Sequence, residues 1–428
     1  MNLIKNGAVA LAVLMLIASL PVSAQDSSIF VQCPNDTRLH TDVDTDPSTR
    51  EDGIECVHLV AGDGMVTMAD DISKKQYIFS FAEVDLPGVR TAPLDETAYA
   101  SWVMQQGLLA ANAPAPTISV DEDDELFLTL TNVGMAMRPD LFDPHTVHWH
   151  GFPQAAAIFD GVPDSSISVN MGASLSYYYN AKDAGTYMYH CHVEATEHMQ
   201  MGMLGNLFVR PRQNRCDSIP DDPAVPGSTC PASHGTTTSK YAYNDGDGST
   251  AYDVDFPIQL GSFDPDFHDA SLNVQPLPFA GMRDRYFLLN GRGYPDTADA
   301  TTVFSTIDPL GKEQFSQPVD SLVTASATLS QRILLRISNL NITEFYTLGS
   351  NLPMEVIALD ARLLRDGDGN NMYYTTNSLT LGGGQSADVI IDTDGLTPGT
   401  YFLYTTNLDR LANDAENFGG MMTEIQIN

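Results

Sequence analysis

Residues 145–150 read His-Thr-Val-His-Trp-His, and residues 185–192 read Gly-Thr-Tyr-Met-Tyr-His-Cys-His. β-Branched and aromatic residues stand between the histidines, which is typical of strands. Because successive side chains of a strand point to opposite faces, the two histidines beside Cys191 share the face opposite to its thiol. In the first stretch the last two histidines share one face, and His145 tends to the other. The stretches therefore supply side chains to two sites on opposite sides of the strands.

One candidate metal site combines a thiolate, two imidazoles and a thioether. A soft thiolate suits Cu(I), and this donor set is that of a type 1 (blue) copper centre for electron transfer. A copper-bound thiolate cannot enter a disulfide, which agrees with the odd number of cysteines, five, in the chain. The candidate ligands are His145, Cys191, His198 and Met203.

A second candidate site consists of the four histidines on the opposite face. The backbone joins Cys191 to a histidine on either side, so an electron at the first site has a short covalent route to the second. Such a pair of sites suits electron uptake from a one-electron donor and delivery to a multi-electron acceptor such as dioxygen. Zinc fits less well, since it has no use for a methionine or for two connected sites. The candidate ligands are His148, His150, His190 and His192.

Short strands with turn signals between them surround these motifs and predict an all-β sandwich over residues 76–212. A Pro/Gly/Ser/Asp-rich stretch, 213–252, is the predicted linker to a second strand-rich region, 253–428. The strands expected in the first region are Tyr77–Phe81, Leu126–Thr131, Thr146–His150, Leu175–Tyr179, Thr186–His190 and Leu204–Val209.

The two regions repeat each other, which predicts a duplicated sandwich. The matched segments are 128–133 with 335–340, 144–150 with 353–359, and 185–192 with 399–407. In the second copy, residues that are not expected to bind copper replace the candidate ligands. These residues are Met354, Ile357, Leu359, Thr405, Thr406 and Asn407.

Residues 1–24 are expected to be a secretory signal, because Lys5 precedes an apolar run from Ala8 to Ala18 and Val22-Ser23-Ala24 is a small-residue cleavage site. That run is too short to span a membrane. An acidic segment, 25–75, follows. We expect a soluble protein that is secreted or periplasmic.

Four cysteines can pair locally, as Cys33–Cys56 and Cys216–Cys230. Disulfides belong to oxidising compartments, so this pairing agrees with export. Asp-rich stretches at 42–46, 245–248 and 366–369 are spaced somewhat like calcium ligands, but they lack a full calcium-binding pattern and are expected to form loops and turns.

The chain is strongly acidic, with 21 Lys and Arg against 55 Asp and Glu and a formal net charge of −34. Phosphate binding needs a basic surface, so nucleic acid is excluded as a partner. The charge favours solubility, and it also attracts cations or a basic redox protein.

The copper motifs resemble those of the multicopper oxidase family, the laccase-like cupredoxin proteins. The resemblance extends over about residues 77–428 and implies two tandem cupredoxin-like Greek-key sandwiches. The residues that carry it are His148-Trp-His150-Gly, Asp160-Gly-Val-Pro, residues 185–192, His198-x4-Met203, Asn290-Gly-Arg-Gly-Tyr-Pro-Asp-Thr and Leu381-Gly-Gly-Gly-Gln-Ser.

The resemblance also implies copper of types 1, 2 and 3. It gives the thiolate site the type 1 role, His148 a type 2 role, and His150, His190 and His192 type 3 roles. Asp160 resembles an acid beside the type 2 copper and is a candidate proton relay. An equally good reading makes it a turn residue before Gly161.

Two departures from the family pattern stand out. Cys191 and His198 lie seven residues apart, where the common laccase pattern has five. The family's trinuclear centre uses eight histidines, and this chain offers four. Three alternatives are open. The first domains of two subunits could face each other across a two-fold axis and supply four histidines each, or a neighbouring subunit could contribute a histidine such as His268 to a smaller copper site. In the third alternative the chain binds only type 1 copper.

We therefore expect a multicopper oxidase that is a homo-oligomer and reduces dioxygen with electrons from a small molecule, a metal ion or a basic redox protein. The alternatives are an enzyme like the copper nitrite reductases, whose spacing His145-x4-His150 also fits, and a blue-copper electron carrier. His234 and His268 are otherwise expected at the surface. Four further methionines are expected mostly in core packing, although thioethers also bind Cu(I): Met135, Met137, Met199 and Met201.

Overall fold

The computed structural model describes residues 29–41, 53–69, 75–220, 222–231, 240–299, 304–307, 313–317 and 321–428. The expected signal segment, the acidic stretch 42–46 and His234 lie outside these residues. In this part of the chain no helix is long and apolar enough to cross a membrane.

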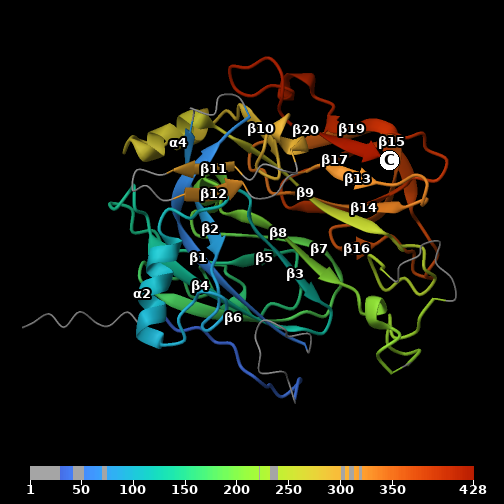
Figure 1. The fold of residues 1–428 in the computed structure, drawn as a ribbon, viewed down its shortest axis with the longest axis horizontal. Coiled ribbons are helices and arrows are strands. Elements are labelled where there is room, and N and C mark those ends of the chain that lie inside the picture. The colour runs from blue at the N-terminus through green and yellow to red at the C-terminus, as the bar shows by residue number, and fades with distance from the viewer. Residues whose placement is uncertain are drawn as a thin grey trace, which may run out of the picture.

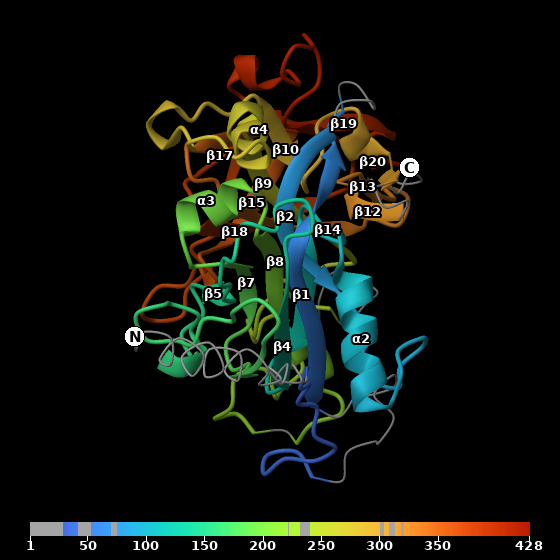
Figure 2. The ribbon, with the colours of Figure 1, turned by 90° about the vertical axis from the view of Figure 1, so that its left-hand side faces the viewer.

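Two four-stranded sheets form the first sandwich, as Figures 1 and 2 show in blue to green. One sheet has the order β2 (Lys75–Glu83), β1 (Ile54–Thr67), β4 (Glu125–Gly134), β6 (Ser174–Asn180). The other has the order β3 (Ala115–Asp121), β8 (Leu204–Arg210), β7 (Gly185–His190), β5 (His148–His150). The six expected strands coincide with these elements, except that β5 is shorter. β1 lies within the segment expected to precede the sandwich, so the first domain begins before residue 76.

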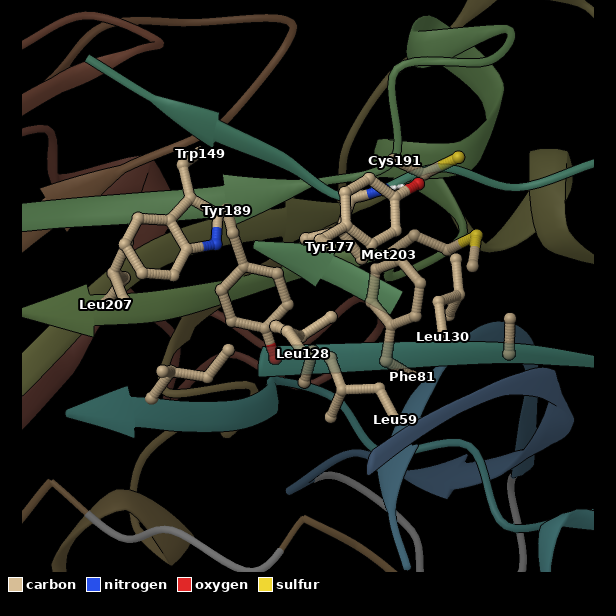
Figure 3. Packing of buried hydrophobic residues seen from close by; sticks show 14 of the residues in the cluster. Leu59, Phe81, Leu128, Leu130, Trp149, Tyr177, Tyr189, Cys191, Met203 and Leu207 are labelled. Atoms are coloured by element: carbon tan, nitrogen blue, oxygen red, sulfur yellow. Dashed lines mark hydrogen bonds between the residues drawn. The ribbon is translucent and has the colours of Figure 1, made fainter. Parts of the chain in front are cut away.

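The core of this sandwich is rich in aromatic residues (Figure 3). Trp149 is fully buried and stacks on Tyr179, with ring centroids 4.0 Å apart. Because Trp149 stands between the two histidines of β5, its burial fixes the direction of both imidazoles, which point to the opposite face.

The second region repeats this topology, as the sequence match predicts. β9 runs parallel to β14 and β13 runs parallel to β20, as β1 does to β4 and β3 does to β8. The strands, in sheet order, are β10 (Tyr286–Leu289), β9 (Val254–Phe263), β14 (Arg332–Asn339), β18 (Gln385–Asp392), β15 (Tyr346–Leu359), β19 (Gly399–Thr405), β20 (Met422–Ile427) and β13 (Val323–Ala325). β16 (Arg362–Leu363) and β17 (Tyr374–Leu381) pair with β15, and β11 (Phe304–Ile307) pairs with β12 (Glu313–Gln317).

The predicted match of residues 144–150 with residues 353–359 is wrong in register. β5 pairs with β7, and the part of β15 that pairs with β19 is Leu348–Ser350, not residues 357–359. The strand segment that corresponds to β5 in the second copy also lacks copper ligands, because Leu348–Ser350 contains no histidine or cysteine.

The helices are short and lie outside the sheets. The side chain of Asp95 caps the first of them by accepting a hydrogen bond from the backbone N–H of Ala98. The α-helices are α2 (Glu96–Gly107), α3 (Ala195–Gln200) and α4 (Pro265–Leu272). The 3₁₀ helices are η1 (Ala157–Phe159), η2 (Arg212–Arg215), η3 (Phe279–Gly281), η4 (Asp296–Ala298) and η5 (Leu408–Arg410).

Both expected disulfides are present, Cys33–Cys56 and Cys216–Cys230, and Cys191 is free and buried. The two Asp-Gly-Asp-Gly stretches are turns, as expected. The carboxylates of Asp245 and Asp366 accept hydrogen bonds from backbone N–H groups two to five residues further along.

A buried polar network joins the two sandwiches where β7 meets β14 and β18. The Asp388 carboxylate accepts hydrogen bonds from the hydroxyls of Thr186 (2.6 Å) and Tyr243 (2.5 Å). Beside it the fully buried Arg336 donates to Asp255 at 3.1 Å. The network holds both domains in one arrangement, because each buried polar group depends on partners from other segments.

Asp388→Ala should therefore destabilise the protein by about 3 kcal/mol, since it leaves two buried hydroxyls without their acceptor and removes a negative charge near the buried guanidinium of Arg336. Urea unfolding followed by tryptophan fluorescence measures this loss. The matched control is Asp368→Ala, which removes an exposed carboxylate. Equal unfolding midpoints for the two variants would contradict the role given to Asp388.

Candidate metal centres

The first candidate site lies where β7 ends. The thiol of Cys191 is 3.2 Å from Nδ1 of His198 and 3.9 Å from Nδ1 of His145. All three side chains are fully buried. His145 is fixed by two backbone hydrogen bonds with Val169, so this imidazole is placed by an antiparallel bridge.

Met203 is positioned by the same segment. Its carbonyl accepts a hydrogen bond from the N–H of Cys191 at 3.1 Å, and its own N–H donates to the carbonyl of His198 at 2.9 Å. Figure 3 shows Met203 beside Cys191 in the aromatic core. The three residues thus form one compact loop closed by main-chain hydrogen bonds.

The long spacing between Cys191 and His198 is accounted for by α3. Glu194 adopts the left-handed conformation (φ 44°) at the start of this helix, and its carbonyl accepts the N–H of His198. The extra residues are used for one helical turn, which brings His198 back to the thiol.

Burial controls the protonation of these groups. It lowers the pKa of His198 to about 4 and that of His145 well below its usual range, so both imidazoles are neutral near pH 7. It raises the pKa of the Cys191 thiol to about 11, although the N–H of Thr146 donates to the sulfur at 3.4 Å. A thiolate here needs a nearby cation, and two neutral imidazoles facing the sulfur fit copper.

The second candidate site is a cluster of four imidazoles on the opposite face, which we call the imidazole face. His148 lies directly across from His190 in the β5–β7 pairing, with ring centroids 5.2 Å apart. His192 is also 5.2 Å from His148, and His150 is 5.8 Å from it. Candidate donor atoms of three of them, His148, His150 and His190, all lie within 4.8 Å of one another.

Backbone carbonyls fix the tautomers of two of these rings. Nδ1 of His148 donates to the carbonyl of Asp160 at 2.5 Å, and Nδ1 of His190 donates to the carbonyl of Cys191 at 2.8 Å. Both rings therefore keep an unprotonated Nε2 for a metal. Burial lowers the pKa of His190 to about 3, and burial together with the neighbouring His148 lowers that of His150.

Asp160 lies in a turn beside the imidazole face. It ends η1, and the following Gly161 has φ 76° with no room for a side chain, because a Cβ would lie 2.2 Å from the carbonyl oxygen of Val147. Its carboxylate also lies 3.5 Å from Nδ1 of His148. The turn is what brings this acid to the imidazole face.

The second domain reaches the imidazole face through Gly384, between β17 and β18. Its φ is 87°, and a Cβ there would lie 2.7 Å from Nε2 of His150. In the sequence, the Gly-Gly-Gly stretch that contains Gly384 indicates a likeness to the family, but no local pattern predicts its contact with His150. The imidazole face therefore lies at the contact between the two domains.

His268 is not at the surface, so that expectation is wrong. It is fully buried on α4, and its Nδ1 donates to the carbonyl of Tyr77 at 2.5 Å. A side chain enclosed in this way cannot act as a ligand in a neighbouring subunit. Met135 and Met201 lie in the buried core, in agreement with the packing role expected for most methionines.

Comparison with known proteins gives two matches to family models described as multicopper oxidase, over residues 96–214 and 275–423. The first match contains every candidate ligand, and together the two cover more than half of the chain. The chain belongs to the multicopper oxidase family. Copper of types 1, 2 and 3 is the cofactor of this family.

Its curated relatives include multicopper oxidase MCE of Talaromyces pinophilus, 36% identical over 103 residues, which are 24% of this chain and 16% of that protein. Laccase abr2 of Aspergillus fumigatus is 36% identical over 117 residues, 26% of this chain and 18% of that protein. The alignments thus span less than a fifth of the length of these relatives.

Solved structures show the same fold over most of the chain. The blue copper oxidase from Nitrosomonas europaea has a TM-score of 0.58 and 20% identity, over 87% of this chain and 86% of that one. The copper nitrite reductase from Nitrosomonas europaea has a TM-score of 0.50 and 15% identity, over 88% and 94%. The cupredoxin-like sandwich fold expected from the sequence is confirmed.

Gly384→Ala should displace His150, because the new methyl group occupies the space of its Nε2. We expect less copper per chain and an unchanged blue absorption band, since the Cys191 site lies on the other side of β7. Gly369→Ala is the matched control, because Gly369 has a similar φ of 84° and open space around it. If both variants bind as much copper as the unaltered chain, Gly384 does not shape the site.

Proposed function

We propose that the chain is a copper-dependent oxidase that takes single electrons from a reducing substrate and reduces dioxygen to water. The observation that carries this proposal is the peptide segment His190-Cys191-His192, which puts a buried thiol on one face and two imidazoles on the other. Copper bound at the two sites would supply the one-electron redox chemistry.

The ligands proposed for each copper are those that the likeness to the family implies, and the geometry of the two sites supports them. Cys191, His145, His198 and Met203 would hold type 1 copper in the aromatic core, where water is excluded. On the imidazole face His148 would hold type 2 copper. The type 3 ligands would be His150, His190 and His192.

The residues around these ligands have separate roles in the proposal. The peptide bonds that flank Cys191 are the electron route between the faces. Asp160 orients His148 through its carbonyl, and its carboxylate, 3.5 Å from that ring, is the group we propose to deliver protons during oxygen reduction. Reducing one dioxygen to two waters consumes four electrons and four protons, so a proton route to this face is required.

The imidazole face needs further ligands, since four histidines are half of the set that the family uses. His148, His150 and His192 are partly exposed, so the face remains accessible to another protein chain. We propose that a second copy faces it across a two-fold axis and contributes its own four imidazoles. The burial of His268 removes support for the alternative in which that residue is the shared ligand.

A nitrite reductase is the second candidate. The donor atoms of His148, His150 and His190 converge within 4.8 Å, which suits a single copper ion held by three imidazoles. The oxidase is favoured because His192 extends the cluster, with its ring 5.2 Å from that of His148.

We also propose that the protein functions in an oxidising compartment outside the cytoplasm. Two disulfides tie down chain segments beside the first domain, and such bonds persist only where thiols are not kept reduced.

The activity is tested with copper-loaded protein and hydroquinone as an uncharged electron donor, by following oxygen with an electrode. We expect oxygen consumption, and we expect Cys191→Ser to lose both the blue absorption band and the activity. Met135→Leu, a conservative change in the same core, is the control and should keep both. Nitric oxide formation from nitrite without oxygen consumption would identify the nitrite reductase instead.

A further inference from the structure

The short segment 198–203 carries two candidate ligands of the thiolate site, His198 at one end and Met203 at the other. The last residues of α3 form its first half, and Figure 2 shows this helix against the second domain, beside α4. The residues between the two ligands set how the imidazole and the thioether approach the sulfur of Cys191. Contacts made by these residues therefore bear on the geometry of the site.

The first domain holds the main chain of this segment through β2. The carbonyl of Met201 accepts a hydrogen bond from the N–H of Phe79 at 3.2 Å, and the carbonyl of Gly202 accepts one from the hydroxyl of Ser80 at 2.6 Å. These bonds fix one side of the segment. The other side is fixed by a side chain of α3 that leaves the first domain.

That side chain is Gln200, which is 1% exposed and bonds to the second domain with both of its polar atoms. Its Nε2 donates to Oδ1 of Asp284 at 2.8 Å, and its Oε1 accepts a longer hydrogen bond from the N–H of Asp264 at 3.4 Å. Glutamine is mostly found at protein surfaces, and a buried amide is costly unless it is hydrogen-bonded. The second domain supplies this pairing for a side chain two residues from His198.

The two oxygens of the Asp284 carboxylate have different partners. Oδ2 accepts hydrogen bonds from three groups of its own domain, the hydroxyls of Ser262 and Thr343 and the amide of Asn341 at 3.3 Å. Oδ1 accepts from Gln200 of the first domain. The single oxygen of an asparagine would serve the three donors of the second domain. A carboxylate at this position adds the acceptor that Gln200 needs.

The contact is a costly one to break. Asp284 is 9% exposed, and its hydrogen-bond donors among the described residues are all neutral groups. Burying a carboxylate without a cation costs free energy, and each donor offsets part of that cost. Loss of the Gln200 amide leaves Oδ1 without its donor, so the carboxylate has to move or to admit water. Because Gln200 ends α3, the helix is then free to shift.

We propose that Gln200 and Asp284 are positioning residues of the thiolate site. By holding α3 against the second domain, the pair fixes where His198 and Met203 stand relative to the sulfur of Cys191. This inference rests on the ligand set proposed above for type 1 copper. It gives the domain that contributes no candidate ligand a part in the geometry of that site.

The test compares Gln200→Met with the unaltered full-length protein. This change keeps the length of the side chain and its neutrality but removes both hydrogen bonds. Copper at the thiolate site is titrated against a competing chelator and followed by the blue absorption band. We expect the copper dissociation constant of this site to rise about tenfold or more, as is usual when a group that supports a metal ligand is replaced. The relative intensities of the thiolate-to-copper absorption bands and the copper hyperfine splitting in electron paramagnetic resonance should change as well.

The reciprocal exchange Gln200→Glu/Asp284→Asn is the rescue variant. It keeps the total charge and the hydrogen bond between the domains, because the amide then donates from position 284 and the carboxylate accepts at position 200. The oxygen that remains at position 284 still serves the donors of the second domain. We expect a spectrum and a copper affinity close to those of the unaltered protein.

Thr186→Val is the matched control. It removes another buried hydrogen bond between the two domains, the one to Asp388 at 2.6 Å, at the end of β7 that is far from Cys191. It should lower the free energy of unfolding and leave the blue spectrum and the copper affinity unaltered. Such a result separates positioning of the site from general stability.

The inference is overturned if Gln200→Met keeps the spectrum and the affinity of the unaltered protein, if Thr186→Val changes them equally, or if the reciprocal exchange restores neither. If Gln200→Met changes both and the exchange restores them, but no donor supports oxygen consumption, the positioning pair stands and the oxidase function fails. Copper-loaded unaltered protein without a blue band would overturn the ligand set and this inference together.

Discussion

The structure depends on one constraint, the alternation of side chains at the end of β7. Cys191 must point into the aromatic core while His190 and His192 point out of it. β7 pairs with β5 on one side and with β8 on the other. In this position the thiol of Cys191 lies near His145 and His198, and the imidazoles of His190 and His192 lie near His148 on the opposite face. Two chemically different sites therefore share three consecutive residues, and neither can move without the other.

Burial makes this arrangement suitable for copper. The first site lies in a core of stacked aromatic rings, where neutral imidazoles are favoured and an isolated thiolate is not. A cation that binds both imidazole nitrogen and thiolate sulfur satisfies all of these groups at once. The second domain contributes no candidate ligand, but it places Gly384 against His150. One of its roles is to shape the surroundings of the imidazole face.

Much of this could be predicted from the sequence, because the deciding signals are local. The strand period separates Cys191 from its neighbours, and cysteine spacing gives both disulfides. Contacts between segments far apart in the chain could not be predicted. The pairing of β1 with β4, the burial of His268 against Tyr77 and the approach of Gly384 to His150 have no local pattern. The wrong register predicted for β15 has the same cause, since a match between two sequence segments does not show which half of a long strand pairs with β19.

The central claim is that the thiolate site and the imidazole face both hold copper and act together. Copper per chain, measured with the absorption spectrum and the native mass on protein loaded with Cu(I) without air and then reoxidised, tests it most directly. The account predicts a blue band, clearly more than one copper per chain, and an oligomer. A blue monomer with a single copper per chain would contradict it, because the four imidazoles would then hold no metal and the chain would only carry electrons.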